Sequence, residues 1–220
     1  MSAELRQCCN RGIGHATAIH LDSLDYHVFS SCLFPTGPGV EELKNKCSCR
    51  LQVLGMNITK DESVQEALEF IKENLGTSQL WAVVNNAGIL KGFSIEITPM
   101  QDFQDNIEVN LYGHIRITKA FLPLLRQSNG RLVNFTSLIG RMVLCHCAVE
   151  WYCAKFGAVG FTQCLRQEMN VWGVSVISIE PEIYKYGWNG ADWGRLVFSH
   201  ESRFQLCSDD HRRRVSRRTG

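Results

Sequence analysis

A tyrosine and a lysine stand three residues apart in the stretch VEWYCAKFGAVGF, which covers residues 149–161. The phenol of Tyr152 can exchange a proton with a substrate oxygen, and a nearby ammonium group such as that of Lys155 favours the phenolate form. Small and apolar residues surround the pair, as in a helix that packs against a core. These residue types, close together in this order, indicate proton-transfer chemistry, although the pairing needs a spacing of four residues.

Two glycine-containing segments could hold a phosphate-bearing ligand. The first consists of Arg11, Gly12, Ile13 and Gly14 at the start of a helical pattern. Glycines in this place let the backbone approach a pyrophosphate at a helix N-terminus, where the N–H groups and the helix dipole favour negative charge. The second is NNAG at residues 85–88, directly after the apolar run WAVV. Taken alone, either segment also suits an ordinary turn.

Strand and helix patterns alternate along the chain around these segments. The continuous apolar run at residues 80–84 predicts a strand that is buried on both faces. Val64, Ala67, Leu68 and Ile71 recur at helical spacing. The predicted strands are 26–33, 50–54, 80–84, 131–136 and 174–179, and the predicted helices begin after Gly12 and cover 40–46, 61–75, 100–126 and 148–170.

This alternation predicts an α/β fold in which a parallel sheet is covered by helices on both faces. Right-handed crossovers lead to a doubly wound, Rossmann-like arrangement of three layers, with strand order 3-2-1-4-5-6. The first strand has to come from AELRQC at residues 3–8, which offers little apolar surface. We therefore expect this strand to be weak or incomplete.

The length of 220 residues suits one sizeable domain. We assign residues 1–190 to it and predict that residues 191–220 form an irregular, disordered basic tail. The five arginines near the C-terminus also suit a nuclear signal or a nucleic-acid patch.

The net charge of +1 gives no electrostatic reason to expect nucleic acid or an acidic membrane as a partner. No apolar stretch reaches the roughly 18 residues of a membrane span. The N-terminal residues MSAELRQCC lack the features of a signal or transit peptide. These features predict a soluble intracellular protein, cytoplasmic or mitochondrial.

The chain has ten cysteines and no visible export signal, so we expect reduced thiols. Cys145, His146 and Cys147 form the tightest cluster, and Cys47 and Cys49 form a second. Neither cluster has the ligand spacing of a zinc site. We expect no metal.

Several short motifs follow one another in a set order. They are NNAG at residues 85–88, VNL at 109–111, FTS at 135–137, the Tyr152 and Lys155 pair, and IEP at 179–181. In this order, and over about residues 8–188, the sequence resembles the short-chain dehydrogenase/reductase family. The stretches LWAVVNNAG, SLIGRM and KFGAVGFTQCLRQEM are similar to the branch of D-3-hydroxybutyrate and retinol dehydrogenases.

The resemblance implies a dinucleotide-binding domain and an NAD(P)-dependent oxidoreductase. Such an enzyme interconverts a secondary alcohol, a hydroxy acid or a retinoid- or steroid-like compound, and its ketone or aldehyde by hydride transfer. It implies that Tyr152 is the general acid/base, that Lys155 binds the nicotinamide ribose, and that Ser137 hydrogen-bonds the substrate oxygen. Asn110 would hold a proton-relay water. The small-molecule alcohol or ketone is the implied partner, and a homo-oligomer is expected.

The resemblance also implies a cofactor site. Its residues are Arg11, Gly12, Ile13 and Gly14 at the phosphates, Asn57 at the adenine, and Asn86, Ala87, Gly88, Lys155 and Pro181 along the cofactor. An acidic residue at the end of the second strand would bind the ribose diol of NAD, but Ser31 and Cys32 stand there. Arg11 could meet the 2′-phosphate of NADP, whereas the branch favours NAD. We expect NAD, with NADP as the alternative.

The sequence departs from the family pattern around the expected site. Cys8 replaces the first glycine of the phosphate loop, and Glu182 replaces a glycine after Pro181. Tyr152 precedes Lys155 by three residues where the family has four, which leaves Trp151 at the family's position. A second hypothesis therefore stays open: a catalytically impaired or truncated relative that acts as a non-enzymatic interaction protein or has no function.

Overall fold

The computed structural model describes residues 2–7, 11–143 and 148–181. Within these residues, six strands form one parallel sheet in the order β3-β2-β1-β4-β5-β6. This order confirms the predicted doubly wound, Rossmann-like α/β fold. The strands are β1 (Ser2–Gln7), β2 (His27–Cys32), β3 (Leu51–Gly55), β4 (Gln79–Asn85), β5 (Arg131–Phe135) and β6 (Ser175–Ile179).

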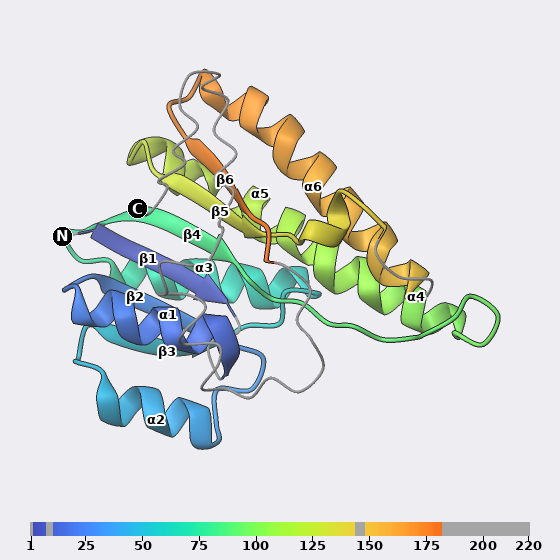
Figure 1. The fold of residues 1–220 in the computed structure, drawn as a ribbon. Coiled ribbons are helices and arrows are strands. Elements are labelled where there is room, and N and C mark those ends of the chain that lie inside the picture. The colour runs from blue at the N-terminus through green and yellow to red at the C-terminus, as the bar shows by residue number, and fades with distance from the viewer. Residues whose placement is uncertain (1, 8–10, 144–147, 182–220) are drawn as a thin grey trace, which may run out of the picture.

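Helices cover both faces of this sheet and complete the three layers (Figure 1). The first face carries α1 (Gly12–Ser23) and α2 (Pro38–Lys46), and the other carries α3 (Asp61–Asn74), α5 (His114–Gln127) and α6 (Val149–Asn170). Val28 and Phe29 show the division, because these neighbours on β2 belong to the separate apolar clusters of the two faces. Alternate side chains of a strand point to opposite faces, so a central strand must be apolar on both.

The first strand corrects the expectation from the sequence. β1 has six residues and pairs with β2 on one side and with β4 on the other, so the prediction of a weak or incomplete strand is wrong. Ala3 and Leu5 are fully buried, and Glu4 is nearly so. A central strand gains ladder hydrogen bonds on both sides whatever its side chains are. Against β4, the pairing register shifts between Ala3 and Glu4.

The helical region predicted at residues 100–126 is not one continuous α-helix. It consists of α4 (Met100–Ile107), a π-helical segment η1 (Glu108–Gly113) and α5. At Gly113, where the segment ends, an added Cβ would lie 2.6 Å from Cδ1 of Ile58, so the Ile58 side chain would have to shift. π-helical turns occur mostly as single interruptions and often at functional sites. This one carries Asn110.

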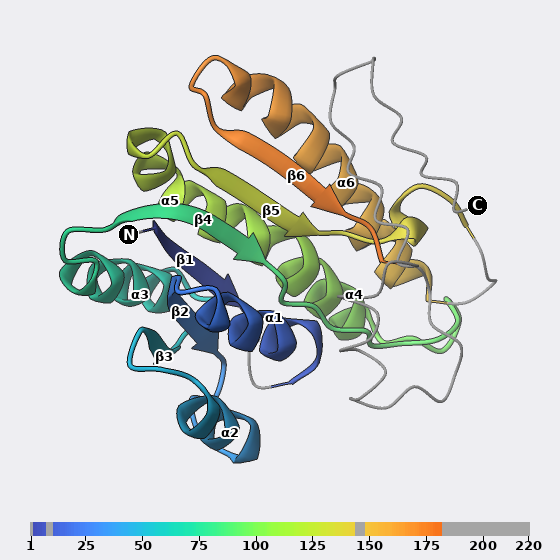
Figure 2. The ribbon, with the colours of Figure 1, turned by 60° about the vertical axis from the view of Figure 1, so that its left-hand side comes forward.

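Because all strands are parallel, their carboxyl ends lie at the same edge of the sheet (Figure 2). The segments after β4 and β5 and the start of α6 meet at this edge, where the short 3₁₀ helix η2 (Leu138–Gly140) packs on α6. The loops at this edge are the usual ligand site of open α/β sheets. Among the described residues, no helix combines the length and apolar character that crossing a membrane requires.

Candidate active site

The side chain of Lys155 is buried beside the carboxyl end of β5. Its exposed fraction is 7%, and its Nζ donates a hydrogen bond to the carbonyl oxygen of Phe135 at 3.2 Å. Burial lowers the pKa of Lys155 from 10.5 to about 8, because a poorly solvated interior disfavours the charged ammonium. A buried lysine with a lowered pKa at the ligand-binding edge of the sheet is a functional-site candidate.

Asn110 and Gly88 lie next to this lysine. A Cβ added to Gly88 would lie 3.0 Å from Oδ1 of Asn110 and 3.9 Å from Nζ of Lys155. The carboxamide of Asn110 accepts a hydrogen bond from the Ile89 amide at 3.1 Å and donates one to the Ile89 carbonyl at 2.8 Å. Asn110 therefore fixes the segment after β4, and glycine at position 88 leaves room for that contact.

Ser137 reaches the same region through η2. Its side chain caps the N-terminus of η2, where Oγ accepts a hydrogen bond from the Ile139 amide at 3.4 Å. Gly140 packs so closely on α6 that an added Cβ would lie 2.6 Å from the carbonyl oxygen of Lys155. The segment that carries Ser137 is thus held against the turn of α6 that carries Lys155.

Tyr152 lies in the first turn of α6, one turn before Lys155. Its exposed fraction is 7%, whereas Trp151, at the family's tyrosine position, is only partly buried. Ala148 before the helix has a left-handed backbone, with φ 61° and ψ 44°. The non-family spacing therefore still buries both Tyr152 and Lys155.

Sequence reasoning missed His114. The ring is buried, and its Nε2 lies 2.8 Å from the carbonyl oxygen of Ala87. A carbonyl can only accept, so Nε2 carries the proton. Burial, and then the positive charge of Lys155, lowers the pKa of His114 to about 4. A neutral His114 therefore ties α5 to the predicted cofactor segment, and its place four residues after Asn110 was the available signal.

The glycine loop at the start of α1 fits a phosphate group. Gly12 has φ +66°, in the left-handed region that favours glycine, and an added Cβ would meet no described atom within 4 Å. Arg11 is exposed, and its side chain does not cap the helix. The first turn contains no acidic residue, so the positive end of the helix dipole is not offset there. Ile13 is partly buried and Gly14 is buried within the helix.

The remaining predicted cofactor residues fall into two groups. Ala87 is buried and Asn86 is partly exposed next to Gly88, at the end of β4. Pro181 follows β6, and its carbonyl accepts a hydrogen bond from the Leu138 amide at 3.2 Å, beside Ser137. Asn57 lies apart, after β3. Its Oδ1 accepts the amide and hydroxyl of Thr59 at 3.0 and 2.8 Å, in a turn of its own.

Other expectations fall on residues that the structure does not describe. They concern Cys8, the Cys145–Cys147 cluster, Glu182 and the tail at 191–220. At the end of β2, Ser31 and Cys32 are both buried, and no acidic residue stands in these two places. In the described part of the chain, no group of three His, Cys, Asp or Glu residues could hold a metal ion.

Sequence comparison places these features among known enzymes. The family model of the short chain dehydrogenases matches residues 8–190. The chain is 40% identical over 188 residues to estradiol 17-beta-dehydrogenase 2 of Mus musculus, which covers 84% of this chain and 49% of that protein. It is 43% identical over 178 residues to mitochondrial D-beta-hydroxybutyrate dehydrogenase of Bos taurus, which covers 79% and 51%. It is 37% identical over 203 residues to retinol dehydrogenase 7 of Mus musculus, and the matched region covers 92% of this chain and 62% of that protein.

Solved structures show the same fold. A short-chain dehydrogenase from Streptomyces avermitilis superposes with a TM-score of 0.77 at 21% identity, over 86% of this chain and 68% of that one. NADPH-bound carbonyl reductase from chicken fatty liver superposes with a TM-score of 0.73 at 24% identity, over 81% of this chain and 78% of that one. The chain spans about half the length of the first curated relatives it matches. None of these likenesses supports a non-enzymatic interaction protein, and the chain belongs to the short-chain dehydrogenase family.

Proposed function

We propose that this chain interconverts an alcohol and its ketone or aldehyde by NAD(P)-dependent hydride transfer. The observation that carries the proposal is the burial of Lys155 beside Gly88 and Asn110, one helical turn after Tyr152. A phenol, a cation and a glycine-containing segment at one edge of a doubly wound sheet are the parts that such a reaction needs. The names of the relatives, which refer to estradiol, hydroxybutyrate and retinol, support alcohols as the substrate class.

The nicotinamide ring, when bound, supplies or accepts the hydride. The residues of the chain then handle the proton and the substrate oxygen. Tyr152 gives its phenolic proton to the ketone oxygen during reduction and takes a proton from the alcohol during oxidation. Ser137 hydrogen-bonds that oxygen. We assign Lys155 to the nicotinamide ribose, and Asn110 holds the segment after β4 along which the cofactor would lie.

We propose NAD as the cofactor, with NADP as the alternative that the experiment must separate. The similarity of residues 80–88 to the hydroxybutyrate and retinol dehydrogenase branch supports NAD. The exposed guanidinium of Arg11 beside the glycine loop supports NADP, because it could pair with a 2′-phosphate. Calorimetric titration with both dinucleotides compares them directly. A higher affinity for NADP would overturn the choice of NAD and leave the proposed reaction class intact.

Turnover tests the reaction class. Purified protein is incubated with NAD or NADP and with 3-hydroxybutyrate, estradiol or retinol in turn, and the formation of reduced nicotinamide is followed. We expect turnover with at least one of these alcohols and a matching amount of ketone or aldehyde. A protein that binds dinucleotide but turns over none of the three classes would contradict the proposed function.

Dinucleotide binding should depend on Gly12. In Gly12→Ala, the left-handed backbone costs about 1 kcal/mol of stability, and the methyl group enters the space assigned to the phosphates. Gly76→Ala is the matched control, since Gly76 has φ +59°, has no described atom within 4 Å of an added Cβ, and lies between α3 and β4. We expect both variants to lose similar stability in urea unfolding. Only Gly12→Ala should lose dinucleotide affinity, by about tenfold or more, in calorimetry.

The comparison separates local strain from loss of a binding site. Equal affinity losses in the two variants would mean that strain alone weakens binding. Unchanged affinity in Gly12→Ala would show that the glycine loop at the start of α1 does not hold the phosphates.

A further inference from the structure

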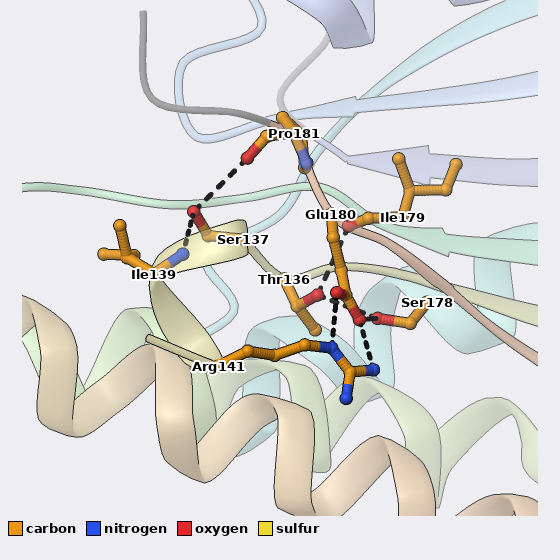
Figure 3. Close-up of polar contacts among 8 residues, drawn as sticks. All are labelled: Thr136, Ser137, Ile139, Arg141, Ser178, Ile179, Glu180 and Pro181. Carbon is orange, nitrogen blue, oxygen red and sulfur yellow. Dashed lines mark hydrogen bonds and ion pairs between the residues drawn. The ribbon is translucent and has the colours of Figure 1, made fainter. Parts of the chain in front are cut away.

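An ion pair joins the two segments that flank Ser137. Arg141 directly follows η2, and Glu180 directly follows β6. Nε of Arg141 lies 2.5 Å from one carboxylate oxygen of Glu180, and Nη2 lies 2.7 Å from the other (Figure 3). The Glu180 side chain is 3% exposed and that of Arg141 is 31% exposed. This is a bidentate ion pair, in which the guanidinium fixes the orientation as well as the position of the carboxylate.

Hydroxyl groups continue this ion pair back to the strand that precedes Ser137. The hydroxyl of Ser178 donates to the Glu180 carboxylate at 3.0 Å and lies 2.8 Å from the hydroxyl of Thr136. The backbone amide of Thr136 donates to the carbonyl of Ile179 at 2.9 Å. The residue before Ser137 is therefore fastened to β6 and its extension by the same network.

Ser137 itself contacts the residue that follows Glu180. Its Oγ donates to the carbonyl oxygen of Pro181 at 3.5 Å (Figure 3). The amide of Leu138 donates to the same oxygen at 3.2 Å. The serine bond is at the long limit for a hydrogen bond, so the hydroxyl can exchange it for a substrate oxygen at little cost. The position of Pro181, and hence the direction in which Ser137 rests, depends on where Glu180 is held.

We propose that Arg141 and Glu180 are positioning residues for Ser137. Their ion pair closes the short segment 137–141 at its far end, while Pro181 holds its near end, so the Ser137 hydroxyl is presented in one orientation. This inference rests on the proposed function, because it gives Ser137 a substrate oxygen to bind. Sequence alone gives no such role, since Arg141 and Glu180 are separated by 38 intervening residues.

The test is a coupling experiment between Arg141 and Ser137. Arg141→Lys keeps the positive charge but loses the bidentate contact with Glu180. It therefore displaces segment 137–141 without leaving the Glu180 carboxylate unpaired. We expect kcat/KM for the alcohol to fall by about tenfold to a hundredfold, as a displacement of about 1 Å at a reacting centre would cause. In a Ser137→Ala background the same replacement should change kcat/KM by less than about twofold, because the group that it positions is absent.

Two controls accompany the experiment. Arg50→Lys alters another arginine ion pair, with Asp25 at 2.7 Å near the opposite ends of the strands, and should leave kcat/KM unchanged. An Arg141→Met/Glu180→Met double variant removes the buried charge from both partners at once and should recover Tm relative to Arg141→Met. Its kcat/KM should stay low, which a purely stabilising role for the pair would not produce.

Hydrogen exchange tests the positioning without relying on turnover. In Arg141→Lys, the amide of Leu138 should exchange about tenfold faster or more, because its acceptor on Pro181 is no longer held. Unchanged exchange would overturn the inference whatever the activity is. If Arg141→Lys lowered kcat/KM equally with the serine present and in the Ser137→Ala background, the inference would also be overturned, while the proposed function would stand. If the unmodified chain showed no turnover, the proposed function would be overturned. Hydrogen exchange of the Leu138 amide would then be the remaining test of whether Arg141 and Glu180 position segment 137–141.

Discussion

Tyr152→Phe is expected to abolish alcohol oxidation while changing dinucleotide affinity by less than about twofold. The replacement removes one oxygen from a side chain that is buried in the first turn of α6 and keeps the ring that fills the space. General acid/base catalysis by a positioned side chain raises the rate by about 10²- to 10⁴-fold, so kcat should decrease by a factor of this size. Steady-state kinetics with a saturating dinucleotide measures the loss, and calorimetry measures the affinity.

Tyr26→Phe is the matched control for this result. Tyr26 stacks on Trp81 with ring centroids 6.2 Å apart, next to the start of β2 and away from the carboxyl edge of the sheet. It should keep the activity of the unmodified chain. If Tyr152→Phe retained more than about a tenth of the activity, the proton would have to pass through another group, and the assignment of Tyr152 would be wrong.

Lys155→Met is expected to abolish activity and to stabilise the folded chain at neutral pH. Burial lowers the pKa of Lys155 from 10.5 to about 8, so holding the charge in the folded state costs about 3 kcal/mol. Methionine has a similar length and no charge. Loss of the hydrogen bond to the Phe135 carbonyl costs about 1 kcal/mol, which leaves a net gain of about 2 kcal/mol in the free energy of unfolding at pH 7.

The sign of the pH dependence follows from the lowered pKa. Between about pH 8 and pH 10.5 the unfolded chain binds more protons at Lys155 than the folded chain does, so the stability of the unmodified chain rises through this window. The advantage of Lys155→Met should therefore be full below pH 8 and should disappear by pH 10.5. Urea unfolding of both proteins at several pH values measures the gap between them.

Lys72→Met serves as the control for this comparison. Lys72 is a partly exposed lysine on α3 whose ion pair with Glu69 lies in solvent. Exposed ion pairs contribute little to stability, so the free energy of unfolding should change by less than about 1 kcal/mol. This change should not vary with pH between about 8 and 10.5. The claim that Lys155 carries a buried charge would be contradicted if Lys155→Met were less stable than the unmodified chain at pH 7 and if this difference in stability did not vary with pH.

The placement of β4 could be predicted from the sequence because its signal is local, and the strand order followed from the alternation of strands and helices with right-handed crossovers. Residues 80–84 form a continuous apolar run, and a parallel strand covered on both faces needs that pattern. β1 was misjudged because its stability comes from backbone bonds to two neighbours, which side-chain polarity does not report. The π-helical interruption at residues 108–113 was missed because it depends on packing against other segments.

The candidate site shows the same division. Lys155 and Asn110 could be predicted because each stands in a motif of known order, and the structure brings both beside Gly88. The pair of Arg141 and Glu180 could not be assigned a role, because its role depends on contacts between segments far apart in the chain. For His114 the sequence offered only its place four residues after Asn110. The effect of the three-residue spacing between Tyr152 and Lys155 also depended on burial, which the structure supplies.

Transfer of a deuterium label tests the central claim most directly. The unmodified protein is mixed with oxidised dinucleotide and with 3-hydroxybutyrate, estradiol or retinol that carries deuterium on the carbinol carbon, and the nicotinamide is analysed by mass spectrometry. The account predicts that, with at least one alcohol, one deuterium passes to the nicotinamide ring as the ketone or aldehyde forms, and that Tyr152→Phe blocks this transfer. Deuterium that stays in all three alcohols, although the dinucleotide is bound, would contradict hydride transfer by this chain.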